Sequence, residues 1–405
     1  MLKLGWGTVN LEARAAGSPY NWSFTGTATQ EQAPMPVPRG KVLGGSSAIN
    51  GQTFIRGAPE DFDTWASWGN DGWGYLDCLP YFRRLENDAD FHDDFHGTDG
   101  PVPVRHHPRE TWPVVQEAFF QAATAAGYPY NPDVNHPEAT GISQRAENNI
   151  EGVRMSMALA YINPVRHRLN LTIRPNVQAR RVALEEGTDG KRAVGVEVES
   201  GGDRFVVEGD DIILCAGAVA SPQLLMLSGI GPAGQLAAQG IPVAVELPGV
   251  GQNMRDHTNV SVRFSVKEGT PEDPDAMRAV RLRYTATGKG ELRLESDDPQ
   301  NCAQHGLSLL EEDWDRERLR ECVRRCVSLL QHSAYDRFIQ EITAPYAGRP
   351  GERRRSDLWL TAQHQHLVPH FRATCKMGPE NDPMAVVDPQ LRVRGVSNLR
   401  VAMLR

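Results

Sequence analysis

The first stretch of the chain that could bind a ligand is a run of four small residues, Gly44, Gly45, Ser46 and Ser47. Small residues let backbone N–H groups approach a ligand closely, and a run of such donors can hold an anion. The two serine hydroxyls add further donors, so the run could bind a phosphate group. The alternative is an ordinary tight turn, because glycine and serine are common in turns.

A second candidate position lies at the end of an apolar segment, "DIILCAGA", at residues 211–218. The segment ends in small residues and is followed by a helix start at 221–231. This pattern predicts a buried parallel strand that feeds a helix, the unit of a doubly wound α/β sheet. Ligands of such sheets bind outside the carboxyl ends of the strands, so the end of this strand favours a ligand site over a plain turn.

The elements that must position these residues follow from local patterns. The proline-rich stretch 32–41 predicts an extended lead-in to the small-residue run. Three helices are expected: a short one beginning near Pro59, one within 111–127 that Gly127 ends, and a charged one within 311–331. β-Branched segments between about residue 170 and residue 218 predict three or four successive strands.

Composition excludes several classes of function. The 405 residues include 43 basic and 51 acidic side chains, a formal charge of -8, so nucleic acid is not an expected partner. The six cysteines are scattered without a CxxC pattern, which favours a reducing compartment. No apolar run approaches the roughly 20 residues of a membrane span, and the N-terminus lacks the apolar core of a signal peptide. We therefore expect a cytoplasmic protein without a transmembrane segment.

Two stretches, "PRGKVLGGSSAINGQTFIRG" and "GAVASPQLLMLSGIGP", resemble the two signature segments of the glucose-methanol-choline (GMC) oxidoreductases, flavoenzymes that oxidise alcohols. Three more are similar to that family and follow in its order: "GWGYLDCLPYFRRLE", "LPGVGQNMRDH" and "HFRATCKMGPENDPMAVVDPQLRVRGVSNLRV". The resemblance covers most of the chain and is nearest to the bacterial choline and alcohol dehydrogenases. It implies a small-molecule alcohol as substrate and leaves the electron acceptor open.

The resemblance also implies FAD as the cofactor and assigns residues to it. The loop residues that would lie against the flavin and its pyrophosphate are Gly44, Gly45, Ser46, Ser47 and Asn50. The backbone of Val177 would meet the adenine, and Gly217 and Ala218 would lie beside the cofactor at the strand end. Some relatives attach the flavin through a histidine where this chain has Ile49, so the FAD is expected to be non-covalent.

The catalytic residue implied by the resemblance is His370, because "HFRATCKMG" matches the family's terminal motif at its histidine. Histidine suits a general base because its ordinary pKa of about 6.5 lies near working pH. Without the motif, His364, His366 and His370 could suggest zinc, but their spacing lacks a fourth ligand, and no metal is expected. His92 and His96, which flank two aspartates, indicate a polar loop.

The expected fold class is α/β, with a doubly wound, Rossmann-like FAD-binding domain and a sheet-and-helix substrate domain. We assign residues 1–255 to a partial FAD-binding domain, 256–369 to a shortened substrate-binding domain, and 370–405 to a C-terminal return to the FAD-binding domain. The family's GxGxxG unit does not precede Pro38, although Glu12 faintly matches its ribose-binding acid. We expect the family's second active-site residue to follow Arg405, so the chain is expected to be truncated at both ends.

The sequence leaves open two alternatives to an FAD-dependent alcohol oxidoreductase. One is a non-catalytic truncated homologue or a gene fragment, a hypothesis that the replacement of motif residues by Ala373 and Lys376 supports. The other is a dinucleotide enzyme that uses NAD(P), which the absorbance of the bound cofactor would distinguish.

We predict that the 405-residue chain binds FAD weakly or not at all, because the helix N-terminus that the GxGxxG unit provides to the pyrophosphate is not among its motifs. Each lost helix-end or charge-assisted contact is worth about 0.5–2 kcal/mol, so several together should cost powers of ten in affinity. The purified chain should be colourless, and a version extended at both ends should be yellow. Stoichiometric flavin in the visible spectrum of the unextended chain would contradict this prediction.

Overall fold

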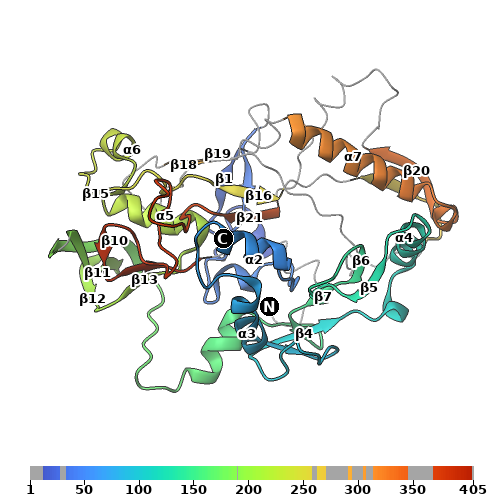
Figure 1. Cartoon of the computed structure of the whole chain (residues 1–405), viewed down its shortest axis with the longest axis horizontal. Coiled ribbons are helices and arrows are strands. Elements are labelled where there is room, and N and C mark those ends of the chain that lie inside the picture. Colours follow the sequence, from blue (N-terminus) through green and yellow to red (C-terminus); the bar gives the residue numbers. More distant parts are fainter. Residues whose placement is uncertain are drawn as a thin grey trace.

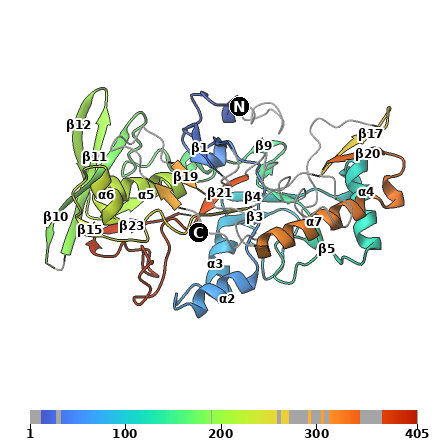
Figure 2. The same ribbon diagram turned by 90° about the horizontal axis from the view of Figure 1, so that it is seen from above.

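The computed structural model describes residues 12–27, 33–188, 190–257, 262–270, 291–293, 304–306, 313–344 and 368–403. Two lobes lie side by side in Figures 1 and 2. One contains α5, α6 and β10 to β15, and the other contains α4, α7 and β20. Two clusters of buried hydrophobic residues are present: one lies mainly in the first lobe but also includes Leu319 and Val323 of α7, and the other lies in the second lobe.

Both lobes contain α-helices. The α-helices are α2 (Pro59–Ser67), α3 (Tyr75–Leu85), α4 (Val114–Ala125), α5 (Gly217–Leu227), α6 (Ala233–Ala238) and α7 (Asp313–Leu330). Shorter helical turns are η1 (Gly45–Ala48), η2 (Arg109–Thr111), η3 (Ala158–Ile162), η4 (Asn163–Val165) and η5 (Ser333–Tyr335). The helices expected near Pro59, within 111–127 and within 311–331 are confirmed by α2, α4 and α7. None of the described helices is both long enough and apolar enough to cross a membrane.

Most of the strands are short. Those before residue 178 are β1 (Phe24–Gly26), β2 (Met35–Val37), β3 (Glu86–Asp88), β4 (Val102–His106), β5 (Tyr130–Asp133), β6 (Ile142–Gln144), β7 (Ala146–Glu147), β8 (Asn149–Ile150) and β9 (Val153–Arg154). Those up to residue 257 are β10 (Gln178–Gly187), β11 (Gly190–Ser200), β12 (Asp203–Glu208), β13 (Ile212–Leu214), β14 (Ile230–Gly231), β15 (Val245–Glu246) and β16 (Arg255–His257). The rest are β17 (Arg263–Val266), β18 (Glu291–Arg293), β19 (Gln304–Gly306), β20 (Ile339–Ala344), β21 (Val368–Arg372), β22 (Val396–Ser397) and β23 (Leu399–Val401).

The sheet of the first lobe combines neighbours in sequence with strands from the C-terminal segment. β10, β11 and β12 pair in antiparallel order, as expected for successive strands. β22 then pairs parallel to β11, and β23 pairs parallel to β13. The C-terminal segment therefore returns to the strands that precede α5.

The prediction of a parallel strand that feeds a helix is confirmed by β13, which runs parallel to β23 and leads into α5. The interpretation that this strand is buried on both faces is wrong. Ile212 and Leu214 are buried, but Ile213 is 54% exposed. Among the described residues β13 pairs only with β23, and its second face has no element that covers Ile213.

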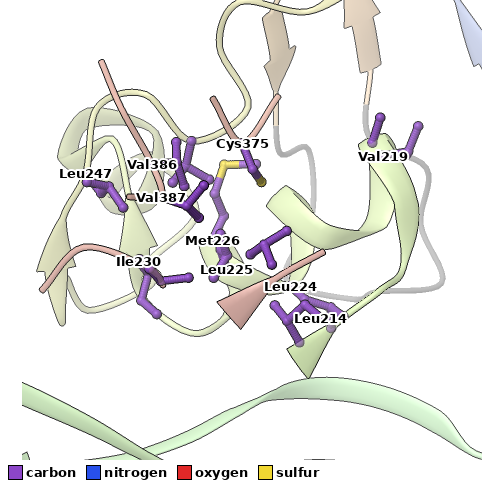
Figure 3. Close-up of a cluster of buried hydrophobic side chains, with 14 of the residues drawn as sticks. Leu214, Val219, Leu224, Leu225, Met226, Ile230, Leu247, Cys375, Val386 and Val387 are labelled. Carbon is purple, nitrogen blue, oxygen red and sulfur yellow. The ribbon is translucent and has the colours of Figure 1, made fainter. Parts of the chain in front are cut away.

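The core of the first lobe gathers around α5, a helix that is hydrophobic on most of its surface. Nine of its residues are buried, and Leu225 and Met226 are fully enclosed. Figure 3 shows these side chains beside Cys375, Val386 and Val387, which come from the C-terminal segment. Burying one large aliphatic side chain stabilises the fold by roughly 1.5–3 kcal/mol, so this cluster anchors the C-terminal segment firmly on α5.

A buried ionic cluster joins β3, β5 and the loops that carry Arg56 and His96, and it corrects the interpretation of the region of His96 as a polar loop. The His96 side chain is fully buried: its Nε2 lies 2.9 Å from Asp133 Oδ2, and its Nδ1 lies 3.2 Å from Glu86 Oε1 and 3.4 Å from Asp88 Oδ2. Arg56 pairs with the same Glu86 carboxylate. His92 is exposed, as a polar loop residue would be. Local sequence does not reveal the burial of His96, because its partners come from distant segments.

Protonated His96 stabilises this cluster. Burial alone would lower the pKa of His96, but the hydrogen bond to Asp133 and the adjacent carboxylates of Asp88 and Glu86 outweigh burial and raise the pKa to about 11. A folded-state pKa above the unfolded value of about 6.5 stabilises the fold fully below pH 6.5. The contribution then falls as the pH rises towards 11.

We predict that His96→Gln lowers the free energy of unfolding by about 3–5 kcal/mol at pH 6, the typical cost of breaking a buried ion pair. The deficit should shrink at pH 9, where wild-type His96 retains less of its advantage. Urea unfolding of both proteins at the two pH values measures this. His92→Gln, an exposed histidine of the same segment, is the matched control and should leave stability nearly unchanged at both. A deficit of equal size at pH 6 and pH 9 would contradict the assigned protonation.

Candidate functional site

The small-residue run forms a tight left-handed turn that leads into η1. Gly44 has a φ of +88° and Gly45 a φ of +55°, values that favour glycine. A Cβ on Gly44 would lie 3.0 Å from the backbone nitrogen of Ala158, whereas a Cβ on Gly45 would meet no atom within 4 Å. Gly44 is therefore required by packing, and Gly45 presents its backbone to open space, where a ligand could approach it.

The two serines differ in what they can offer to a ligand. The Ser47 hydroxyl donates to the carbonyl oxygen of Gly44 at 2.6 Å and accepts from the N–H of Met157 at 2.9 Å. The Ser46 oxygen accepts from the N–H of Gly40 at 3.2 Å, which leaves its own proton for another partner. Ser47 therefore holds the turn, and Ser46 is the hydroxyl with a donor to offer.

Asn50 is bound by an arginine that the sequence analysis did not single out. Arg154 Nη1 donates to the carbonyl oxygen of Asn50 at 2.6 Å and to its Oδ1 at 2.8 Å. Burial lowers the pKa of Arg154 to about 10, Glu147 opposes this, and Arg14 adds to it. Arg154 thus brings a desolvated positive charge to the end of the small-residue turn.

A second desolvated arginine, Arg39, lies on the lead-in to the turn. Burial lowers its pKa to about 10, Asp256 opposes this, and the nearby Arg14 adds to it. The desolvation of Arg14 lowers its own pKa as well. Three half-buried or buried guanidinium groups around one glycine turn fit an anion of high charge, such as the pyrophosphate of a dinucleotide.

His370 lies in β21, which pairs antiparallel with β16. The backbone N–H of His370 donates to Asp256 Oδ1 at 2.8 Å, and the side chain of His370 is exposed. The register shifts between the two aligned pairs of this ladder, and the Asp256 carboxylate takes the N–H at the shift. Asp256 therefore fixes the backbone that carries His370.

Two contacts hold β21 and the residues after it against the other candidate positions. The guanidinium of Arg39 lies over the ring of the buried Phe371, 4.9 Å from its centroid. The hydroxyl of Thr374, which is completely buried, donates to the carbonyl oxygen of Ala218 at 2.7 Å. The lead-in to the glycine turn, β21 and the start of α5 therefore meet in one place.

The remaining predicted residues lie at the start of α5 and directly before β10. Gly217, with a φ of +79°, begins α5, and a Cβ on it would meet no atom within 4 Å. Val177 is half-buried directly before β10, a strand that packs on α5. His364 and His366 lie outside the described residues.

Four residues that meet around these elements were not predicted from the sequence: Arg39, Arg154, Asp256 and Thr374. Arg39 stands next to the predicted turn, so its position was a usable signal. Asp256 and His370 are 114 residues apart, and Thr374 and Ala218 are 156 apart. Only the pairing of β16 with β21 and the docking of the C-terminal segment on α5 bring these residues together.

A group of potential metal ligands occurs elsewhere, at Asp88, Asp90 and His106, whose ligand atoms lie within 4.8 Å of one another. Asp88 Oδ1 accepts from the N–H groups of Asp90 and Phe91, and Asp90 Oδ2 accepts from the N–H of His106. These hydrogen bonds explain the arrangement without an ion.

Comparison with known proteins identifies the fold and the family. Two family models described as "GMC oxidoreductase" match the chain, one at residues 22–259 and the other at residues 286–402. The chain is 33% identical to an oxygen-dependent choline dehydrogenase of Sinorhizobium fredii and 32% identical to an uncharacterized GMC-type oxidoreductase of Rhodococcus erythropolis; each match covers 95% of this chain and 80% of the relative. Pyridoxine 4-oxidase from Mesorbium loti has a similar structure, with a TM-score of 0.86 and 26% identity over 97% of this chain and 84% of that one. Formate oxidase, at 22% identity, shares the fold, with a TM-score of 0.84 over 98% of this chain and 85% of that one.

These matches confirm the expected α/β fold with an FAD-binding and a substrate-binding domain, and FAD as the cofactor of the family. The domain boundaries at residues 255 and 369 stay predictions. The two signature segments quoted from the sequence both lie within the first matched region. The chain belongs to the GMC oxidoreductase family.

Proposed function

We propose that the chain is an FAD-dependent oxidoreductase that converts an alcohol to a carbonyl compound, with His370 as the base that accepts the hydroxyl proton. The observation that carries this proposal is the position of β21 between the glycine turn and the start of α5. The exposed His370 side chain projects from this strand, next to the residues assigned to the cofactor. FAD, when bound, supplies the hydride acceptor.

In this proposal the residues of the chain have separate roles. The backbone of Gly44 and Gly45, the Ser46 hydroxyl and the positive charges of Arg39 and Arg154 hold the pyrophosphate. Ser47 and Asn50 keep the turn in shape through their hydrogen bonds to Gly44, Met157 and Arg154. Gly217 and Ala218 lie beside the cofactor at the strand end, and Val177 meets the adenine.

The proton leaves the substrate hydroxyl for the imidazole of His370. Asp256 does not contact the substrate in this scheme; it holds the backbone N–H of His370 and so orients the base. Because relatives are named choline dehydrogenase, choline is the first alcohol to test, with oxygen and a soluble quinone compared as electron acceptors.

We predict that His370→Ala lowers kcat about 10²–10⁴-fold, the typical contribution of a general base, with little change in flavin content. Flavin reduction in a single turnover, at matched flavin loading after reconstitution with excess FAD, measures the chemical step directly. His92→Ala, which removes an exposed histidine elsewhere, should leave the rate unchanged.

An unchanged reduction rate in His370→Ala would remove this residue from the mechanism. Absence of reduction by every alcohol in the flavin-loaded wild type would favour the alternative of a non-catalytic homologue.

We predict that Gly45→Val abolishes the FAD binding that the chain shows on reconstitution with excess FAD, because a side chain would occupy the open space in which the turn presents its backbone. Gly127→Val is a matched control: Gly127 also has a positive φ, +87°, and open space around its Cβ position, but it ends α4 far along the chain from the turn. Both variants should lose stability through backbone strain, of order 1–3 kcal/mol. Equal FAD affinity in the two variants, measured beside their melting temperatures, would show that the turn has no role in binding.

A further inference from the structure

The face of β21 that carries His370 also carries two arginines. Arg255 of β16 and Arg372 of β21 are directly opposite each other in the antiparallel pair. The register shifts within this ladder, but the exposure of the side chains still alternates: His370 is exposed, Phe371 is buried and Arg372 is half-buried, so Arg372 lies on the side of His370 and Phe371 on the other. Side chains of directly opposed residues lie on one face, which places Arg255 there too.

Like charges opposite each other in a sheet are destabilising. Among the described residues, neither Arg255 nor Arg372 forms a hydrogen bond or ion pair through its guanidinium. Burial lowers the pKa of Arg372, Arg255 adds to this, and Asp256 and Asp61 oppose it. The two arginines are thus opposed in the ladder, and neither guanidinium has a hydrogen-bond or ion-pair partner in the described part of the chain.

The two nearby carboxylates are already engaged. Asp256 Oδ1 accepts the backbone N–H of His370 at 2.8 Å. Asp61 Oδ2 accepts the N–H of Ala58 at 3.0 Å at the start of α2. Both carboxylates moderate the positive charge of the arginine pair from a distance but form no ion pair with it. The guanidinium N–H groups therefore remain as donors for an external anion.

We propose that Arg255 and Arg372 bind an oxyanion group of the substrate, and therefore that the substrate is an anionic alcohol. This proposal rests on the alcohol oxidation proposed above. Guanidinium groups present paired N–H donors that match the geometry of carboxylates and phosphates. Two residues along a strand span about 7 Å, a separation that a small hydroxy acid bridges between its hydroxyl at His370 and its anionic group at the arginines. The same charges disfavour a cationic alcohol such as choline.

The test compares alcohols of one shape and different charge on flavin-loaded protein. The probes are 4-(hydroxymethyl)benzoate and its neutral amide, with 3-hydroxypropanoate and its amide as a smaller pair, and choline as the cation. Wild-type protein should give a kcat/KM for each carboxylate at least 10-fold above that for its amide and for choline. A phosphonate analogue of the benzoate distinguishes the two oxyanions, and preference for either one over the amide supports the site.

Arg372→Gln should raise KM for the carboxylates about 10–100-fold, leave their kcat within about threefold, and leave KM for the amides unchanged. Arg255→Gln should act in the same direction, and Arg372→Lys, which keeps the charge but loses the paired donors, should fall between Arg372→Gln and wild type. Arg204→Gln, on the exposed strand β12, is the matched control and should have no effect.

Three results would overturn the proposal. Arg372→Gln could change KM equally for carboxylate and amide, wild-type protein could prefer the amide or choline, or Arg372→Gln could lose FAD affinity, which would assign the arginine pair to the cofactor.

Binding of 4-(hydroxymethyl)benzoate, measured by calorimetry, does not depend on turnover. If no alcohol reduces the flavin, the proposed function fails, but tight carboxylate binding that Arg372→Gln weakens would still support the anion site. Absence of that binding in wild type would reject it.

Discussion

The completely buried hydrogen bond from Thr374 to the carbonyl oxygen of Ala218 is the constraint on which the candidate site depends. A buried polar group without a partner costs about 1–3 kcal/mol, so this hydroxyl and this carbonyl fix the C-terminal segment to one position on α5. Because only Ala373 separates Thr374 from the end of β21, the same bond sets where His370 lies. The hydrophobic cluster around Leu225, Met226 and Cys375 supplies the stabilisation that keeps the segment in place.

Desolvated positive charge is the second organising feature. Arg14, Arg39 and Arg154 each lose hydration on folding, which lowers their pKa values, and the charges of Asp256 and Glu147 offset this only in part for Arg39 and Arg154. A fold that tolerates such an arrangement gains from any anion that replaces the lost water. The buried cluster around His96 is the opposite case, since three carboxylates there outweigh burial and keep a histidine protonated. The chain thus separates a site where burial outweighs the nearby carboxylates from a cluster where the carboxylates outweigh burial.

Local signals in the sequence were sufficient for α2, α4 and α7 and for the small-residue turn, but not for α3 and α6. A helix start was predicted at 221–231, whereas α5 already begins at Gly217. Local signals were also insufficient for the exposure of Ile213 and the burial of His96, because both depend on which distant segments pack against them. The pairing of Arg255 with Arg372 has the same origin: it depends on a register between two strands more than 100 residues apart, and a shift of one residue would move either side chain to the other face. The family motif located His370, but only the ladder with β16 identified Asp256 as the group that holds it.

The two faces of β21 have different electrostatic roles in the proposed function. Phe371 turns one face towards Arg39 and the lead-in to the glycine turn, where the cofactor's pyrophosphate is assigned. His370 and Arg372 turn the other face towards the assigned substrate. Because side chains alternate along the strand, the arginines proposed to bind the two anions lie on opposite sides of one ladder. This separation reduces the repulsion between their like charges. Asp256 lies near both groups: burial lowers the pKa of Arg39 and that of Arg372, the charge of Asp256 opposes this in both cases, and its oxygen accepts the N–H of His370. One carboxylate at the shift in the ladder thus links the positions of the base, the cofactor charges and the substrate charges.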